Sequence, residues 1–139
     1  FLQQEGFTNI TILDIAPKAV EILQEKFQDN PEIKVICGDF FTHEGQYDLM
    51  IEQTFFCAIM PELREKYVSK SSSLLKNGGK IIGVLFDTQF EKQGPPFGGN
   101  SAEYTTLFED FYELKTLEKC YNSIPERQGK EVFVHFIKK

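Results

Sequence analysis

An alternation of buried strands with amphipathic helices constrains this chain more than any other feature of its sequence. Residues 10–15 are β-branched and apolar, which predicts a buried strand. Residues 17–28 open with Pro17 and repeat apolar side chains at helical spacing. The predicted order is strand 10–15, helix 17–28, strand 33–41, strand 47–53, helix 61–74, strand 80–87, helix 101–111 and a closing hairpin of strands 113–121 and 131–139.

This order indicates an α/β fold with a mostly parallel sheet, because helices between strands return the chain to the same edge. The closing hairpin supplies an antiparallel strand. We expect one domain over residues 1–139, a length that suffices for a sizeable core. Residues 88–101 are rich in glycine and proline and predict a long loop, of the kind that often serves function.

Composition excludes several classes of partner. The net charge of -6 argues against nucleic acid, which favours a basic surface. No apolar run approaches the ~18 residues of a membrane span. The three cysteines are dispersed, which is typical of reduced thiols and of a cytoplasmic location. We expect a small-molecule substrate and no metal site; the oligomeric state is left open.

Acidic and polar side chains gather where the predicted strands end. Asp14 ends the first strand, Asp39 follows the second, and Glu52 and Gln53 end the third. Ligands of open α/β sheets bind beyond the carboxyl ends of the strands. These residues therefore predict one rim of a binding site.

Asp14 has two interpretations. A carboxylate at such a strand end offers two acceptor oxygens to the hydroxyls of a ribose. Alternatively, Asp14 caps the helix that begins at Pro17, since aspartate is a common capping residue. Spacing alone leaves both open.

The stretch GDFF, residues 38–41, also has two interpretations. Asp39 can accept a hydrogen bond from an exocyclic amine while Phe40 packs against a flat ring, and an adenine needs both. Alternatively, Asp39 is solvated and the two phenylalanines belong to the core. Neighbouring side chains in extended backbone point opposite ways, so at least one of Phe40 and Phe41 is expected in the core.

Several longer motifs carry a family resemblance over nearly the whole chain. The chain resembles a class I S-adenosylmethionine-dependent methyltransferase of the thiopurine S-methyltransferase family, nearest to its thiol and halide methyltransferase branch. The matching stretches are LDIAPKAVE, GDFF, YDLMIEQTFFCAIMPELREKYV, LLKNGGKIIGVLF, GPPFGG and IPERQGKE. The resemblance implies a Rossmann-like methyltransferase sheet, S-adenosylmethionine as cofactor, and methyl transfer to a thiol, a thiolate, a halide or a thiopurine.

The resemblance also implies roles for single residues. Asp14 would bind the ribose hydroxyls of the cofactor, and Asp39 and Phe40 would contact its adenine. Gln53 stands where relatives place a residue that touches the cofactor. Relatives have other residue types at this position, which leaves the side-chain role of Gln53 open.

Aromatic side chains are the candidates for lining the pocket in which the methyl acceptor meets the cofactor, because the sulfonium of S-adenosylmethionine is a cation and is attracted to π faces. Phe55 and Phe97 are expected to line it, with core or lid packing as the alternative. Phe56 is expected in the core.

No catalytic residue is expected, since a thiolate or a halide needs no general base. His43 is expected in a surface loop rather than in catalysis. Arg127 either attracts an anionic substrate or pairs with a nearby glutamate.

The resemblance places the family's glycine-rich cofactor loop and first strand upstream of Phe1. We therefore expect a methyltransferase domain without its N-terminal cofactor-binding segment, with weak cofactor binding. Two alternatives are a degenerate domain without activity and, less favoured, a nicotinamide-dependent dehydrogenase.

Overall fold

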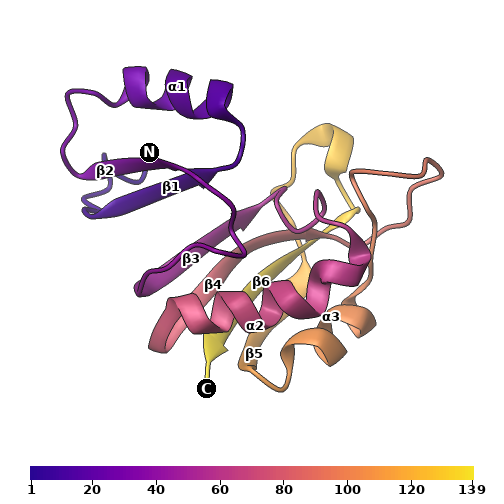
Figure 1. Ribbon diagram of the computed structural model, residues 1–139. Helices are drawn as coiled ribbons and strands as arrows, with labels where there is room; N and C mark the ends of the chain where they lie inside the picture. The colour runs from indigo at the N-terminus through magenta and orange to yellow at the C-terminus, as the bar shows by residue number, and fades with distance from the viewer. The chain divides into compact units, whose positions relative to one another are not determined.

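The computed structural model describes all residues from Phe1 to Lys139 (Figure 1). The chain divides into two compact units, residues 1–44 and residues 45–139. The assignment of a single domain to the whole chain stays a prediction.

The first unit is a strand, a helix and a strand: β1 (Ile10–Asp14), α1 (Pro17–Lys26) and β2 (Ile33–Cys37). The two strands pair in parallel, and the helix lies over one face of the pair (Figure 1). Pro17 begins the helix, where its missing N–H costs no hydrogen bond. Val20 is the fully buried residue of α1 and holds the helix on the strands.

The second unit is a four-stranded sheet in the order β3-β4-β6-β5. Strands β3 and β4 are parallel, and β6 runs antiparallel to both β4 and β5. One reversed strand, supplied by the C-terminal hairpin, therefore interrupts a parallel sheet, as predicted. The elements are β3 (Tyr47–Gln53), α2 (Arg64–Leu74), β4 (Leu75–Phe86), α3 (Ser101–Phe108), β5 (Tyr112–Lys119) and β6 (Glu131–Lys138), with short 3-10 turns at Pro61–Leu63 and Pro125–Arg127.

The starts of α2 and β4 are among the boundaries that differ from the sequence-based expectation. The helix expected from Pro61 opens as a 3-10 turn, and α2 begins at Arg64. Strand β4 begins at Leu75, whereas the sequence predicted a strand from residue 80. Leu75 is fully buried and pairs with Tyr47, so burial draws this segment onto the sheet. The register of β3 against β4 shifts between Tyr47 and Leu49, and Gly78, with φ of 74°, allows this shift without backbone strain.

The core of the second unit is a cluster of aromatic rings between the sheet and the two helices. The Phe108 ring lies at its centre, 5.0 Å from the ring centre of Phe136 and 5.7 Å from that of Tyr112. Buried tyrosine hydroxyls are paired: that of Tyr112 shares a 2.7 Å hydrogen bond with Ser71. The fully buried rings are Phe56, Tyr67, Tyr104, Phe108, Tyr112 and Phe136.

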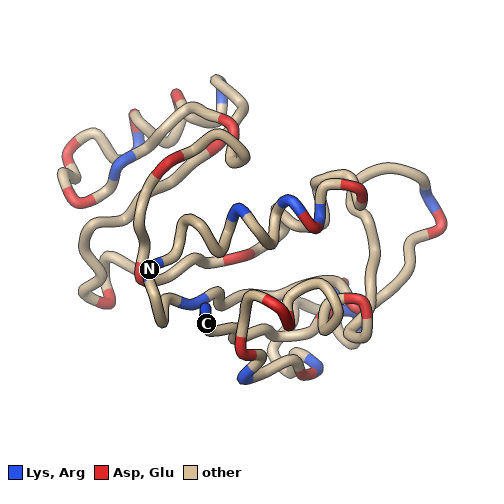
Figure 2. The backbone as a smooth tube through the Cα atoms, turned by 60° about the horizontal axis from the view of Figure 1, so that its bottom comes forward, with Lys and Arg blue, Asp and Glu red and all other residues tan.

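Charged residues of both signs follow one another along the backbone rather than forming a long run of one sign (Figure 2). None of the helices has the length and apolar character that crossing a membrane requires.

Phe108→Ala should destabilise the fold strongly, because the substitution leaves a cavity at the centre of the aromatic cluster. We expect a loss of about 3–5 kcal/mol in the free energy of unfolding, measured by urea denaturation. Phe111→Ala is the matched control, since Phe111 lies three residues further on and is 40% exposed. Equal losses in the two variants would contradict the assigned core.

Candidate functional site

The carboxyl ends of β1 and β2 bring two carboxylates to one edge of the first unit. Asp14 is the last residue of β1 and pairs with Cys37, the last residue of β2. The Gly38 N–H donates to the Asp14 carbonyl at 3.0 Å, so the pairing continues to the residue before Asp39. The parallel register therefore places Asp14 and Asp39 on the same edge, as predicted.

Asp14 shapes the turn from β1 into α1. Its Oδ1 accepts a hydrogen bond from the Ala16 N–H at 2.8 Å, whereas Oδ2 makes no hydrogen bond. The residue in the N-cap position is Ala16, and no side chain caps the helix. The capping alternative is therefore wrong, and one carboxylate oxygen of Asp14 remains available to a ligand.

Asp39 has a similar arrangement. Its Oδ1 accepts from the Phe41 N–H at 2.8 Å, and its carbonyl accepts from the backbone N–H groups of Thr42 and His43. Oδ2 of Asp39 makes no hydrogen bond. The turn that these bonds close begins directly after β2, so the strand is shorter than the sequence suggested.

Phe40 and Phe41 are both half-buried, so the expectation that one of them belongs to the core is not met. Their rings meet edge to face with centres 5.5 Å apart. The reason is the turn after β2: the two residues are not in extended backbone, and their side chains do not point to opposite faces of the sheet.

Glu52 organises the carboxyl end of β3 in the second unit. Its side chain is 4% exposed, and its Oε1 accepts from the N–H groups of Phe55 at 3.0 Å and Phe56 at 2.9 Å. Its Oε2 accepts from the Tyr67 hydroxyl at 2.9 Å. The carboxylate thus ties the end of the strand to the following turn and to α2.

The surroundings of Glu52 shift the pKa of its carboxyl group. Burial raises the pKa of Glu52 above its ordinary value of 4.5, and the hydrogen bonds from Phe56, Tyr67 and Phe55 oppose that shift. Burial and the neighbouring Glu52 raise the pKa of Tyr67 well above its usual range. Since the carboxylate already accepts three hydrogen bonds within the protein, Glu52 is a structural anchor rather than an acid or base for a substrate.

The turn held by Glu52 presents two of the predicted site residues. Gln53 ends β3 and is exposed, and Thr54 follows with a positive φ of 66°. The Phe55 ring is 40% exposed and lies 6.0 Å from the Tyr67 ring. Gln53 therefore ends β3 with Phe55 two residues further on, and Phe56 lies in the core, as expected.

Phe97 lies in the loop between β4 and α3 and is joined to the turn after β3 by one backbone hydrogen bond. Its N–H donates to the Cys57 carbonyl at 2.7 Å, which links the loop to the turn after β3. Its half-buried side chain lines an open hollow of about 370 Å³. The other residues of this hollow, referred to below as the loop hollow, are Pro61, Gln89, Phe90, Lys92, Gln93, Gly94, Pro96 and Gly98.

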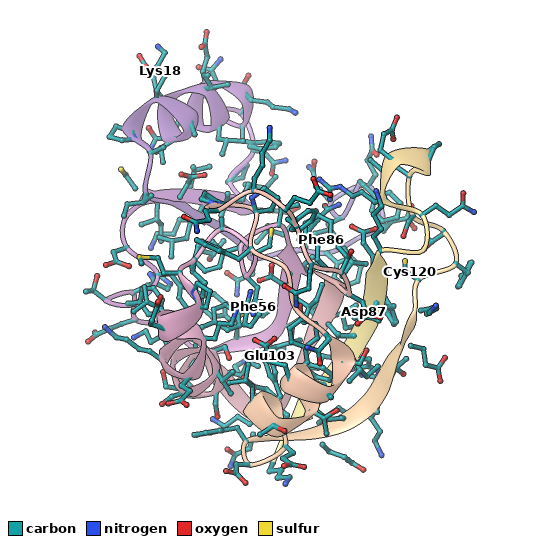
Figure 3. The ribbon with its side chains drawn as sticks, turned by 90° about the vertical axis from the view of Figure 1, so that its right-hand side faces the viewer. Lys18, Phe56, Phe86, Asp87, Glu103 and Cys120 are labelled. Atoms are coloured by element: carbon teal, nitrogen blue, oxygen red, sulfur yellow. The ribbon has the colours of Figure 1, made fainter.

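A second cavity, of about 10 Å³, lies beyond the ends of β3 and β4 and has room for roughly one water molecule. Arg127 borders it, forms an ion pair with Glu131 at 3.4 Å and stacks over Phe86. Figure 3 labels Phe86 and Asp87, which mark the end of β4. Of the two interpretations of Arg127, pairing with a nearby glutamate is the one observed.

Cys57 and His43 also occupy defined environments. The Cys57 thiol is buried and donates to the Thr54 carbonyl at 3.3 Å, and burial raises its pKa. His43 is half-buried within the turn that Asp39 closes.

Sequence reasoning missed the partners of Glu52 and the buried Arg64. A glutamate followed three and four residues later by aromatic residues gives no sign that it accepts their N–H groups. Arg64 is 3% exposed, although a charged residue at the start of a predicted helix is usually solvated. The role of Arg64 depends on Gly98 and Glu103, which are distant in the sequence, whereas that of Glu52 depends on the backbone path of the turn after β3 and on Tyr67 of α2.

Comparisons with known proteins identify the family and the fold. A family model described as thiopurine S-methyltransferase matches residues 5–139. A probable thiol methyltransferase 2 from Arabidopsis thaliana is 37% identical over 97 residues, which cover 66% of this chain and 43% of that protein. A thiocyanate methyltransferase 1 from Brassica oleracea is 30% identical over 125 residues, which cover 86% of this chain and 55% of that protein. The chain therefore spans about half the length of these relatives.

A solved structure matches the fold. The N-methyltransferase NodS from Bradyrhizobium japonicum in complex with S-adenosyl-L-homocysteine superposes with a TM-score of 0.72 at 11% identity. The match covers 92% of this chain and 65% of that one, and at this identity it shows the fold alone.

The contribution of Glu52 to stability should fall as the pH rises above about 4.5, the ordinary pKa of a glutamate. The raised pKa means that the folded state holds the Glu52 proton more tightly than the unfolded state does. This contribution to the free energy of unfolding is therefore fully present below that value and is lost as Glu52 ionises in the folded protein. Glu52→Gln should flatten this decline, measured by urea denaturation across the pH range.

Tyr67→Phe supplies the opposite test. It removes a hydrogen bond that lowers the pKa of Glu52, so the decline should become steeper. A Glu52→Gln protein that keeps the pH dependence of the wild type would refute the assignment.

Proposed function

Because the chain belongs to the thiopurine S-methyltransferase family, we propose that the protein transfers a methyl group from S-adenosylmethionine to a small sulfur nucleophile. The observation that carries the proposal is the pair of carboxylates at the edge of β1 and β2. The names of two relatives, a probable thiol methyltransferase and a thiocyanate methyltransferase, support a sulfur acceptor. The match to a methyltransferase family removes the reason to consider a dehydrogenase.

The first unit would hold the nucleoside part of the cofactor. Oδ2 of Asp14 would accept from a ribose hydroxyl, and Oδ2 of Asp39 would accept from the adenine amino group. Both carboxylates have acceptor capacity left, because their Oδ1 atoms alone are used by the turns. The Phe40 ring and backbone N–H would contact the adenine. The donors of the nucleoside and the acceptors of this edge are therefore matched in chemistry.

The second unit would receive the reacting groups. Gln53 and Phe55 lie at the end of β3, where the exposed face of Phe55 can attract the positive sulfonium. The loop hollow beside Phe97 is within the usual size range of small-molecule sites and is lined by aromatic rings, prolines and amides. We propose this hollow as the acceptor site, with Phe97 as a substrate-binding residue.

Positioning would be the main contribution of these residues. S-adenosylmethionine supplies a methyl group on a sulfonium, so its leaving group is built in. A thiolate or a halide attacks that carbon without help from a base. The protein then has to align the two partners and exclude water.

Three finer proposals follow from the same observations. The acceptor is a thiol or thiolate, with halide and thiopurine as alternatives. The thiols of Cys37, Cys57 and Cys120 are all free, which supports a reducing, cytoplasmic location. Residues 1–139 form part of one methyltransferase domain.

An acceptor screen tests the function. The full-length protein should methylate bisulfide or an aryl thiol in the presence of S-adenosylmethionine, with iodide and thiocyanate tested in parallel. The measurement is the amount of S-adenosylhomocysteine released. Transfer to halides alone would exclude the sulfur acceptor, and no binding of S-adenosylmethionine by calorimetry would favour a degenerate domain.

Asp39→Ala in the full-length protein should weaken the binding of S-adenosylmethionine by about 1–3 kcal/mol, the value of a lost buried hydrogen bond. Calorimetric titration measures the change. Asp39→Asn keeps an acceptor for the Phe41 N–H but replaces the second oxygen by a donor, so it should weaken binding while preserving the turn. The control is Asp29→Asn, an exposed carboxylate of the same unit. Unchanged affinity in both Asp39 variants would remove Asp39 from the site.

A further inference from the structure

We propose that Arg64 is the positioning residue of the acceptor site, because its guanidinium holds residues 97–99 against the start of α2 and so sets the width of the loop hollow. The assignment of an acceptor to this hollow rests on the proposed function. The positioning itself rests on contacts within the second unit.

Arg64 joins four segments through one buried group. It is the first residue of α2 and is 3% exposed. Its Nη2 donates to the Gly98 carbonyl at 2.7 Å, and its Nη1 donates to the Glu103 carboxylate of α3. Its guanidinium carbon lies 4.8 Å from the centre of the Phe56 ring, in the turn after β3. Figure 3 labels Phe56 and Glu103, two of the three residues that the guanidinium contacts.

These contacts connect the segments that line the loop hollow. Pro61, three residues before Arg64, lines the hollow together with Gly98 and other residues of the loop. The bond from Arg64 to the Gly98 carbonyl therefore joins the segment that begins with Pro61 to the loop. A change in this bond would move Gly98 and, with it, Phe97.

The loop between β4 and α3 is tightly held at residues 97–99 and less firmly held in the residues that precede them. A Cβ on Gly98 would lie 2.1 Å from the Thr88 carbonyl oxygen, and one on Gly99 would lie 2.2 Å from the Tyr104 hydroxyl, so no larger residue fits. The Phe97 and Gly99 N–H groups donate to Cys57 and Thr88. By contrast, residues 90–96 take part in no hydrogen bond. Phe90 packs edge to face against Phe86, with ring centres 5.0 Å apart. The position of residues 91–96 therefore depends on this contact at one end and on the anchoring of residues 97–99 at the other.

Stability alone is a poor reason for this arrangement. A buried guanidinium is costly to desolvate, and Nε of Arg64 has no hydrogen-bond partner. A well-packed apolar side chain of similar volume often stabilises the folded protein as much as a buried ion pair does. What an apolar side chain lacks is the planar fork of donors, which fixes the directions of Gly98 and Glu103 at the same time.

Hydrogen exchange in the full-length protein tests the positioning role. In Arg64→Lys the charge remains but the fork is lost, so the amides of Phe97 and Gly99 should exchange faster by about tenfold or more. Amides of β6 at the centre of the sheet should change by less than about threefold. The matched control is Lys76→Met, which removes the exposed ion pair with Asp48 and should leave the Phe97 and Gly99 amides unchanged.

Equal acceleration throughout the second unit would overturn the proposal, because it would indicate a purely structural role. If Arg64→Lys does not fold, Glu103→Gln takes its place. That variant keeps an acceptor and loses the charge, and it should accelerate the same two amides selectively but to a smaller degree.

Kinetics separate the positioning role from the proposed function. Arg64→Lys should raise KM for the methyl acceptor by about fivefold or more, while the Kd for S-adenosylmethionine stays within about twofold. An unchanged acceptor KM would show that the loop does not set acceptor binding and would overturn the proposal. If the wild-type protein transfers no methyl group, the proposed function fails, and the exchange comparison still decides whether Arg64 positions the loop.

Discussion

The buried carboxylate of Glu52 is the interaction on which the second unit depends. It accepts the N–H groups of Phe55 and Phe56 and the hydroxyl of Tyr67, so it joins a strand end, a turn and a helix. The neighbouring strand is adapted to it: a Cβ on Gly83 would lie only 2.0 Å from the Glu52 carbonyl oxygen. Both the backbone and the side chain of Glu52 are therefore fixed in position, and the turn that follows is fixed through its hydrogen bonds to the Glu52 carboxylate.

Two buried ionic groups then hold Phe56 from different directions. Glu52 accepts its backbone N–H, and the guanidinium of Arg64 lies over its ring. Their hydrogen bonds are made largely within the protein, which leaves little capacity for proton transfer to a substrate. Such an arrangement suits the methyl transfer proposed above, because that reaction needs alignment of the partners more than it needs acid or base.

The sequence predicted the edges of the candidate site better than its local hydrogen bonds. Asp14 and Asp39 could be placed on one edge because adjacent parallel strands end on the same side. Neither the bond from Ala16 to Asp14 nor the turn closed by Asp39 was evident, since an aspartate after a strand can cap, turn or bind. The burial of Phe40 and Phe41 was predicted wrongly, because extended backbone was assumed for two residues that lie in a turn.

By itself, the sequence determined the order of strands and helices, the α/β class, the reversed C-terminal strand and the family. These follow from local periodicity and from motifs that are contiguous in the chain. Only the tertiary structure decided where β4 begins, which oxygens of the aspartates remain available, and why Arg64 is buried. The start of β4 and the burial of Arg64 depend on partners remote in sequence: Leu75 packs against the sheet, and the Arg64 guanidinium meets Gly98 and Glu103 more than 30 residues away. The free oxygens of the aspartates depend instead on the backbone path of the turns, in which the Ala16 and Phe41 N–H groups each reach the aspartate two residues before them.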